Sequence, residues 1–64
     1  MTRNKLRGAR VEKNLTQTQL AELIGMSPAT YCKKEQGQSD FYIREAFEIC
    51  KVLGKSPEEI FFKQ

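Results

Sequence analysis

Apolar residues recur every three or four positions along most of the chain, and turn residues interrupt this pattern at short intervals. Such spacing is typical of the buried face of an α-helix, and no stretch alternates apolar and polar residues for long enough to form a strand. The pattern predicts helices at residues 3–13, 17–24, 28–36 and 41–53, and a short last helix that begins at residue 57. We therefore expect an all-α fold, a compact five-helix bundle that forms one domain over residues 1–64.

Capping and turn residues support these boundaries. Thr16 and Gln19 have the three-residue spacing of a capping box, and Ser27 before Pro28 has the form of an N-cap followed by a first helical residue. Asn14 is suited to a left-handed position after the first helix. Glycines suited to the same conformation follow the next three helices, at Gly25, Gly37 and Gly54.

The segment from residue 41 to the C-terminus is richest in apolar residues. We assign six of them to the core: Ile43, Ala46, Ile49, Cys50, Leu53 and Ile60. This leaves Phe47, Val52, Phe61 and Phe62 partly without a place in so small a core, so we expect them to form a homodimer interface. The alternative is that Phe61 and Phe62 cap a minimal core, because small domains expose apolar surface in any case.

Basic residues are concentrated in the first half of the chain. Residues 1–34 contain seven Lys or Arg and two acidic residues, whereas residues 35–64 contain four and six, for a net charge of +3. This asymmetry indicates a surface that binds a polyanion, although a solvated basic helix face explains it about equally well. No apolar run is long enough to span a membrane and residues 1–10 lack the apolar stretch of a signal peptide, so we expect a cytoplasmic protein without a membrane partner.

Several kinds of chemistry have no support in the sequence. The chain has no histidine, and Cys32 and Cys50 lie far apart, so we expect two reduced thiols and neither a metal site nor a disulfide. No nucleophile motif or phosphate-binding glycine loop occurs, and Glu58 and Glu59 are explained as the acidic first turn of a helix. We therefore expect a protein that is not an enzyme and has no cofactor.

The spacing of two helices across a very short turn is that of a helix-turn-helix. Six segments of the chain carry a resemblance to a known family: Leu15-Thr16-Gln17, Leu20-Ala21, Ile24-Gly25-Met26-Ser27, Glu35-x-Gly37, 43–54 and 56–61. They resemble the phage-repressor and Cro-like family, which includes lambda-repressor-like domains and xenobiotic-response-element-type regulators. The resemblance covers residues 6–61. It implies a bacterial or phage-encoded transcriptional repressor that binds double-stranded DNA sequence-specifically, with the helix at 28–36 in the major groove and two copies on an inverted-repeat operator.

The resemblance also assigns site residues. It places Gln17 on the DNA backbone and against the recognition helix, Ser27 near a phosphate, and Pro28, Ala29, Cys32 and Lys33 toward the bases. Lys33 can donate to guanine and Ala29 can contact a thymine methyl group. Weaker candidates for backbone contacts are Thr16, Gln36, Gln38 and Ser39.

An ion pair between Arg10 and Glu35 is implied as well. The guanidinium can hold the carboxylate and still turn a donor toward a phosphate, although a helix-positioning ion pair without a DNA contact is at least as compatible with the residues. We expect Tyr31 in the core with its hydroxyl at the surface. Lys34 has two open interpretations, a packed stem with its ammonium on a phosphate or a solvated side chain.

A different class of function also fits this sequence. A helix-turn-helix fold can serve chiefly as a protein-interaction module, for instance an antitoxin or an adaptor. DNA binding that weakens with salt would favour the regulator, because Arg3, Lys5, Arg7, Arg10, Lys33 and Lys34 would displace counterions from phosphates. Partner binding that survives the loss of Lys33 would favour the interaction module.

Overall fold

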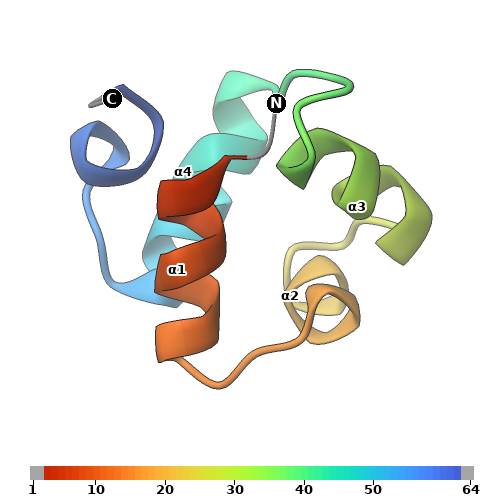
Figure 1. Ribbon diagram of the computed structural model, residues 1–64, viewed down its shortest axis with the longest axis horizontal. Coiled ribbons are helices and arrows are strands. Elements are labelled where there is room, and N and C mark those ends of the chain that lie inside the picture. Colours follow the sequence, from red (N-terminus) through yellow and green to blue (C-terminus); the bar gives the residue numbers. More distant parts are fainter. Residues whose placement is uncertain (1–2, 63–64) are drawn as a thin grey trace.

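The computed structural model describes residues 3–62, which form four α-helices and one short π-helical turn (Figure 1). The elements are α1 (Asn4–Glu12), α2 (Gln17–Leu23), α3 (Pro28–Glu35), α4 (Ile43–Leu53) and η1 (Glu58–Phe62). No strand occurs within this range. The prediction of an all-α bundle of five helical elements is confirmed, with boundaries that differ by one or two residues in most elements.

The caps predicted for α2 and α3 are present. The Gln19 main-chain N–H donates to Thr16 Oγ1 at 3.0 Å, and the Thr16 N–H donates to Gln19 Oε1 at 2.9 Å, which completes the capping box. Ser27 Oγ accepts from the Thr30 N–H at 3.2 Å. Asn14 has a φ of 59°, the left-handed conformation predicted after α1. These local bonds satisfy main-chain donors that a helix start otherwise leaves open.

The predicted start of α4 at Phe41 is wrong. The helix begins at Ile43, because Tyr42 is extended and its N–H donates to Glu45 Oε1 at 2.9 Å, as an N-cap residue. Phe41 instead packs from the loop between the rings of Tyr31 and Phe61, with centroid distances of 5.9 and 5.5 Å. An aromatic ring therefore enters the core from a position outside the helix.

The last element also differs from the α-helix that was expected. Residues Glu58–Phe62 form a single π-helical turn. Ser56 caps it as predicted, because the Ser56 N–H donates to Glu59 Oε2 at 2.8 Å and the Glu59 N–H donates to Ser56 Oγ at 3.3 Å.

The core lies where the five elements meet. Its buried apolar side chains are Leu6, Ala9, Leu20, Ala21, Tyr31, Ile49, Cys50, Leu53 and Ile60. Of the six side chains that were assigned inward, Ala46 is half-buried and Ile43 is 75% exposed. The assignment of Ile43 is wrong because Phe41 packs against the core in its stead, while Ile43 begins the helix on its outer side.

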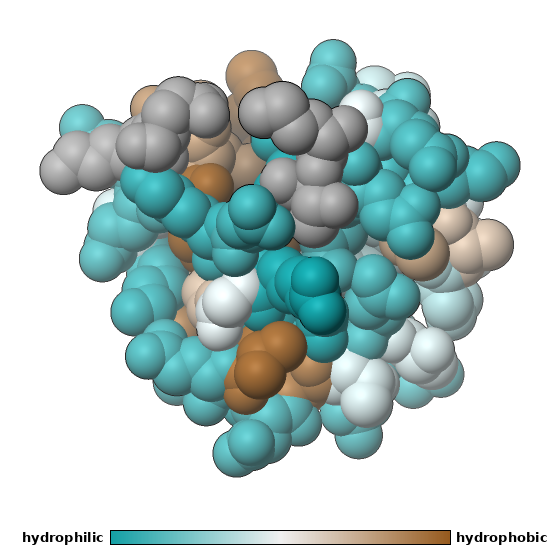
Figure 2. All heavy atoms as spheres, viewed as in Figure 1, coloured by the Kyte–Doolittle hydropathy of each residue, from teal (hydrophilic) through white to brown (hydrophobic). Residues whose placement is uncertain are grey.

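The helix-turn-helix and η1 lie at opposite ends of the molecule, with α1 between them (Figure 1). Helix α2 packs against α3 and α4, and α1 packs against η1. Figure 2 shows that hydrophilic residues cover most of the face on which α1 lies, with small apolar spots between them. None of the helices in the described range is long and apolar enough to cross a membrane.

Candidate nucleic-acid interface

The turn between α2 and α3 sets the two helices of the motif. Gly25 has a φ of 71°, a conformation that costs most other residues about 1–2 kcal/mol. The Met26 N–H then donates to the Ala21 carbonyl oxygen at 2.8 Å, so the chain turns tightly before Ser27 caps α3. This is the tight connection by which a helix-turn-helix holds its second helix at a fixed angle.

Helix α3 has one exposed stripe and one buried side. Tyr31, Lys34 and Glu35 are buried. The opposite stripe, which we call the reading face, consists of Pro28, Ala29, Cys32, Lys33 and Gln36, all of them exposed or half-buried. Their spacing of one, three and four residues places them together along the helix. The structure thus brings together the side chains that the family resemblance directed at bases.

Side chains of the reading face also contact one another. Gln36 Nε2 donates to Cys32 Sγ at 3.3 Å, and Gln38 Nε2 donates to Gln36 Oε1 at 3.0 Å. Lys33 is exposed and has no ion pair among residues 3–62. Its ammonium is therefore available to an acceptor outside the protein, whereas the amides of Gln36 and Gln38 are partly occupied.

The remaining candidates surround the helix starts and the loop after α3. Thr16 and Ser27, the caps of α2 and α3, are both exposed. Ser27 Oγ also donates to Thr30 Oγ1 at 2.8 Å. Ser39 is exposed in the loop after α3. Hydroxyl groups at the start of a helix lie beside the free N–H groups that suit a phosphate.

Glu35 is the polar centre that fixes α3. Its carboxylate accepts four hydrogen bonds: from Arg10 Nε at 2.8 Å, Arg10 Nη2 at 3.3 Å, Gln17 Nε2 at 2.8 Å and the Tyr31 hydroxyl at 2.7 Å. Only 1% of Glu35 is exposed. The four donors come from α1, α2 and α3, so one buried charge joins the three helices. Gln17 thereby braces the recognition helix, which is half of the role that the resemblance implied for it.

The titration of this cluster follows from its contacts. Burial alone would raise the pKa of Glu35, but the hydrogen bonds from Arg10, Gln17 and Tyr31 outweigh it and lower that pKa below its ordinary value. The bond to Glu35 raises the pKa of Arg10. Burial, followed by the bond to Glu35, raises the pKa of Tyr31. The pair is therefore held as carboxylate and guanidinium, with a neutral phenol beside it.

One expectation about this cluster is wrong, and one of the two alternatives for Arg10 gains support. The Tyr31 hydroxyl does not reach the surface, because the residue is fully buried and the hydroxyl donates to Glu35. Arg10 is only 8% exposed, and its Nη1 donates to the Leu15 carbonyl oxygen at 2.7 Å. These hydrogen bonds hold the guanidinium within the chain, so the geometry supports the helix-positioning role of Arg10.

The structure agrees with the packed stem of the first interpretation of Lys34, and it gives the ammonium a partner within the chain. The Lys34 side chain is buried, and its ammonium donates to Glu45 Oε1 at 2.7 Å while it lies 4.5 Å from the centroid of the Tyr42 ring. Burial would raise the pKa of Glu45, but the bond from Lys34 outweighs it and lowers that pKa. Lys34 therefore ties α3 to α4 through an ion pair within the chain.

Lys34, Glu45 and Arg3 form a second polar cluster, and the sequence did not predict that these residues meet. Arg3 donates from Nε to the Lys34 carbonyl oxygen at 3.2 Å, forms an ion pair with Asp40 at 3.2 Å, and lies 5.5 Å from the centroid of Phe41. The only local signal was the position of Glu45 three residues after Tyr42, which indicates a cap and says nothing of Lys34.

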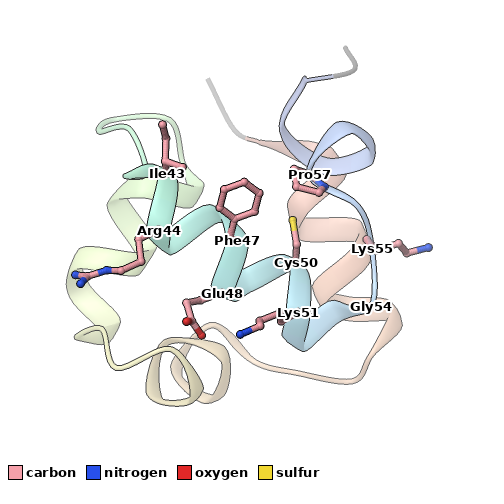
Figure 3. Close-up of a pocket in the computed structure, with 9 residues that line it drawn as sticks. All are labelled: Ile43, Arg44, Phe47, Glu48, Cys50, Lys51, Gly54, Lys55 and Pro57. Carbon is pink, nitrogen blue, oxygen red and sulfur yellow. The ribbon is translucent and has the colours of Figure 1, made fainter.

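The predicted dimer residues fall into two groups. Phe47 and Phe62 are 54% and 72% exposed. Val52 and Phe61 are half-buried and pack against the core of the same chain, so most of their apolar surface is used there. Figure 3 shows the exposed ring of Phe47 standing out from α4 beside Pro57.

The comparisons with known proteins agree with this geometry. A helix-turn-helix family model matches residues 6–60. An uncharacterised HTH-type transcriptional regulator of Methanocaldococcus jannaschii is 41% identical over 59 residues, which cover 92% of this chain and 89% of that protein. No solved structure matches. The chain therefore belongs to the helix-turn-helix family of DNA-binding transcription regulators, as the spacing of its motif predicted.

Proposed function

We propose that this protein is a repressor that binds double-stranded DNA sequence-specifically, with α3 in the major groove. The observation that carries the proposal is the division of α3 into two sides. Glu35 and Lys34 hold the buried side by five hydrogen bonds, one of them within the helix and four to other elements. Lys33 on the reading face has an ammonium without an ion pair in the described range, residues 3–62. A rigid helix with a free donor on its outer face is what base recognition in the major groove needs.

The contacts to the DNA backbone would surround this helix. Gln17, Thr16 and Ser27 lie at the N-terminal ends of α2 and α3, where main-chain N–H groups and the helix dipole favour a phosphate. Gln36, Gln38 and Ser39 follow at the other end of α3. Such contacts set register and carry little sequence information, so base choice rests mainly on Pro28, Ala29, Cys32 and Lys33.

Binding as a pair of copies follows from the small size of the reading face. One recognition helix reads a short site, and members of this class gain specificity by placing two helices about 34 Å apart on an inverted repeat. The exposed Phe47 and Phe62 lie outside the helix-turn-helix and leave the reading face open. A homodimer on an inverted-repeat operator is therefore part of the proposal.

The test begins with selection of bound sequences from random duplex DNA by the purified protein. The selected duplex is then titrated with wild type, Lys33→Ala and Gln17→Ala, with Lys13→Ala as the control because Lys13 is exposed at the end of α1 and carries the same charge. Lys33→Ala should reduce discrimination at one base position by about 1–3 kcal/mol. Gln17→Ala should weaken binding to every duplex, and Lys13→Ala should change little.

Unchanged affinity in both test variants would contradict the assigned reading face. Failure to select any sequence, together with capture of a protein partner that survives Lys33→Ala, would favour the interaction module instead. Repression itself is tested with a reporter gene whose promoter overlaps the selected site. Expression that does not fall when the protein is present would remove the repressor role but leave DNA binding intact.

A further inference from the structure

The start of α1 lies beside the end of α3 (Figure 1). Arg3, the residue before α1, donates from its main-chain N–H to the Glu35 carbonyl oxygen at 2.8 Å and from Nε to the Lys34 carbonyl oxygen at 3.2 Å. We propose that Arg3 is a positioning residue for DNA binding: it fixes the loop after α3 so that Gln38 and Ser39 reach the DNA backbone, and it contacts no DNA itself. The inference rests on the proposed function and adds to it a residue outside the helix-turn-helix.

Arg3 closes the C-terminal end of the recognition helix. The last carbonyl groups of a helix lack partners within it, and a cation at this end also interacts favourably with the helix dipole. Arg3 supplies donors to the carbonyl groups of Lys34 and Glu35, the last two residues of α3. Glu35 is thus held both at its carboxylate and at its main-chain oxygen. The end of the recognition helix therefore has a fixed place relative to the start of α1.

The same side chain holds the loop that follows α3. Arg3 Nη2 donates to Asp40 Oδ1 at 3.2 Å, and the guanidinium lies 5.5 Å from the ring centroid of Phe41. Gln38 and Ser39, which are candidates for contacts with the DNA backbone, directly precede these two anchored residues and are exposed. Where the loop presents their side chains therefore depends on where Arg3 holds Asp40 and Phe41.

The packing of α4 against α3 does not depend on Arg3. The Tyr42 N–H and the Lys34 ammonium both donate to Glu45 Oε1, at 2.9 and 2.7 Å, which joins the two helices without Arg3. The side chain of Asp40 is 97% exposed, and an ion pair of this kind adds little to stability. Loss of the Arg3 side chain should therefore release the loop while the helices stay in place.

This arrangement requires the shape of an arginine side chain. The guanidinium directs one nitrogen to a main-chain carbonyl group and another to a carboxylate, while it lies 5.5 and 5.9 Å from the ring centroids of Phe41 and Phe61. A lysine has the same charge but a single nitrogen, so it cannot hold both partners in this geometry. Arg3→Lys therefore separates an effect of the charge of Arg3 from an effect of its two directed donors.

The experiment titrates the selected duplex at a temperature where circular dichroism shows every variant to be folded. Arg3→Ala and Arg3→Lys should each weaken binding about tenfold, because the loop no longer presents two hydrogen-bonding side chains to the DNA backbone. Lys13→Ala is the matched control: it changes net charge as Arg3→Ala does, +3 − 1 = +2, at an exposed position at the other end of α1. Its affinity should change by less than about twofold.

A double-mutant cycle measures whether Arg3 acts through the loop. In a chain that already carries Gln38→Ala and Ser39→Ala, the further change Arg3→Ala should weaken binding by less than about twofold, because the contacts that it positions are already lost. The slope of affinity against salt should be the same in Arg3→Ala as in wild type, since no cation leaves a phosphate. A purely structural role would leave the affinity of the folded protein unchanged in both backgrounds.

Three results would overturn the inference while the wild type still binds the selected duplex, so that the proposed function stands. In the first, Arg3→Ala binds as tightly as Lys13→Ala. In the second, Arg3→Lys binds like wild type and the salt slope of Arg3→Ala falls by about 0.9, the sign of a direct phosphate contact. In the third, Arg3→Ala weakens binding equally with and without Gln38 and Ser39. A wild type that binds no duplex would overturn the proposed function and this inference together.

Discussion

The hydrogen bond from Tyr31 to Glu35 offers a sharp test of the polar centre. In Tyr31→Phe the ring stays, so the contact with Phe41 at 5.9 Å between centroids is kept, and only the donor at 2.7 Å from Glu35 Oε2 is lost. Glu35 retains its three bonds from Arg10 and Gln17. The substitution therefore removes one bond to a fully buried charge and leaves the packing of the core nearly unchanged.

A hydrogen bond to a charged group contributes about 1.5–3 kcal/mol. For a chain of 64 residues the free energy of unfolding is of order 3–10 kcal/mol, so the loss is a large part of the total. In a domain of this size, 1 kcal/mol corresponds to about 4–8 °C in Tm, and the expected decrease is therefore about 6–24 °C. The pKa of Glu35 should rise as well, because the Tyr31 bond is one of the contributions that lower it.

The assay is thermal and urea unfolding followed by circular dichroism, at neutral pH and across the acid range. Tyr42→Phe is the matched control, because it deletes the same hydroxyl from a residue that is 71% exposed and keeps the ring beside the Lys34 ammonium. Surface changes of this kind usually alter stability by less than about 0.5 kcal/mol. Below about pH 4.5 the unfolding free energy of Tyr31→Phe should fall by less than that of wild type, because a smaller depression of the Glu35 pKa leaves less stability to lose on protonation.

Two outcomes would refute the reasoning. If Tyr31→Phe were as stable as Tyr42→Phe, the hydroxyl would contribute nothing to the buried carboxylate. If it were destabilised at neutral pH but its unfolding free energy fell on acidification by as much as that of wild type, the loss would come from altered packing and not from the bond to Glu35. Affinity for DNA at a temperature where the variant is folded should change less than stability does, since Gln17 still braces α3 through Glu35.

Three further predictions follow from the same contacts. Stability should fall as the pH drops below about 4.5, because the pKa values of Glu35 and Glu45 lie below that ordinary value. Carboxylates with a lowered pKa stabilise the fold only while they are ionised. The unfolding free energy measured across the acid range checks this. Gly8→Ala should stabilise the protein by about 0.5–1 kcal/mol, since Gly8 lies within α1 and no atom lies within 4 Å of an added Cβ. Gly25→Ala should destabilise it by about 1–2 kcal/mol, because Gly25 has a φ of 71°, which an alanine adopts only with strain. Urea unfolding of the two glycine variants should show opposite signs. DNA affinity should fall as the salt concentration rises, and the slope should reflect only a few cations. Arg3, Arg10 and Lys34 form ion pairs within the chain, whereas Lys5, Arg7 and Lys33 have none among residues 3–62. An affinity that does not change with salt would contradict DNA binding.

The sequence was sufficient for the helical elements and their caps. Thr16 with Gln19 and Ser27 before Pro28 act through bonds that span only three residues, so their spacing along the chain predicts the bond directly. The start of α4 escaped this reasoning. Phe41 has the apolar character of a helix residue, yet its place depends on Tyr31 and Phe61, which are ten and twenty residues away.

The candidate site divides in the same way. The exposed stripe of α3 was predictable, because residues at spacings of three and four share a face whatever the helix packs against. The family resemblance also predicted the pair of Arg10 and Glu35, which is present. The state of Lys34 was not predictable, since its partner Glu45 comes from another helix and the ion pair forms only when α3 and α4 meet.

The sequence by itself thus determined the helix-turn-helix, its caps and the residues that face outward on α3, because these depend on local periodicity and short-range hydrogen bonds. Only the tertiary structure decided which charges are free. Lys33 and Lys34 are adjacent and chemically identical, but the first is exposed and the second is buried against Glu45 and Tyr42. Adjacent helical positions differ by about 100° in direction, and the environment in each direction is set by elements distant in the chain.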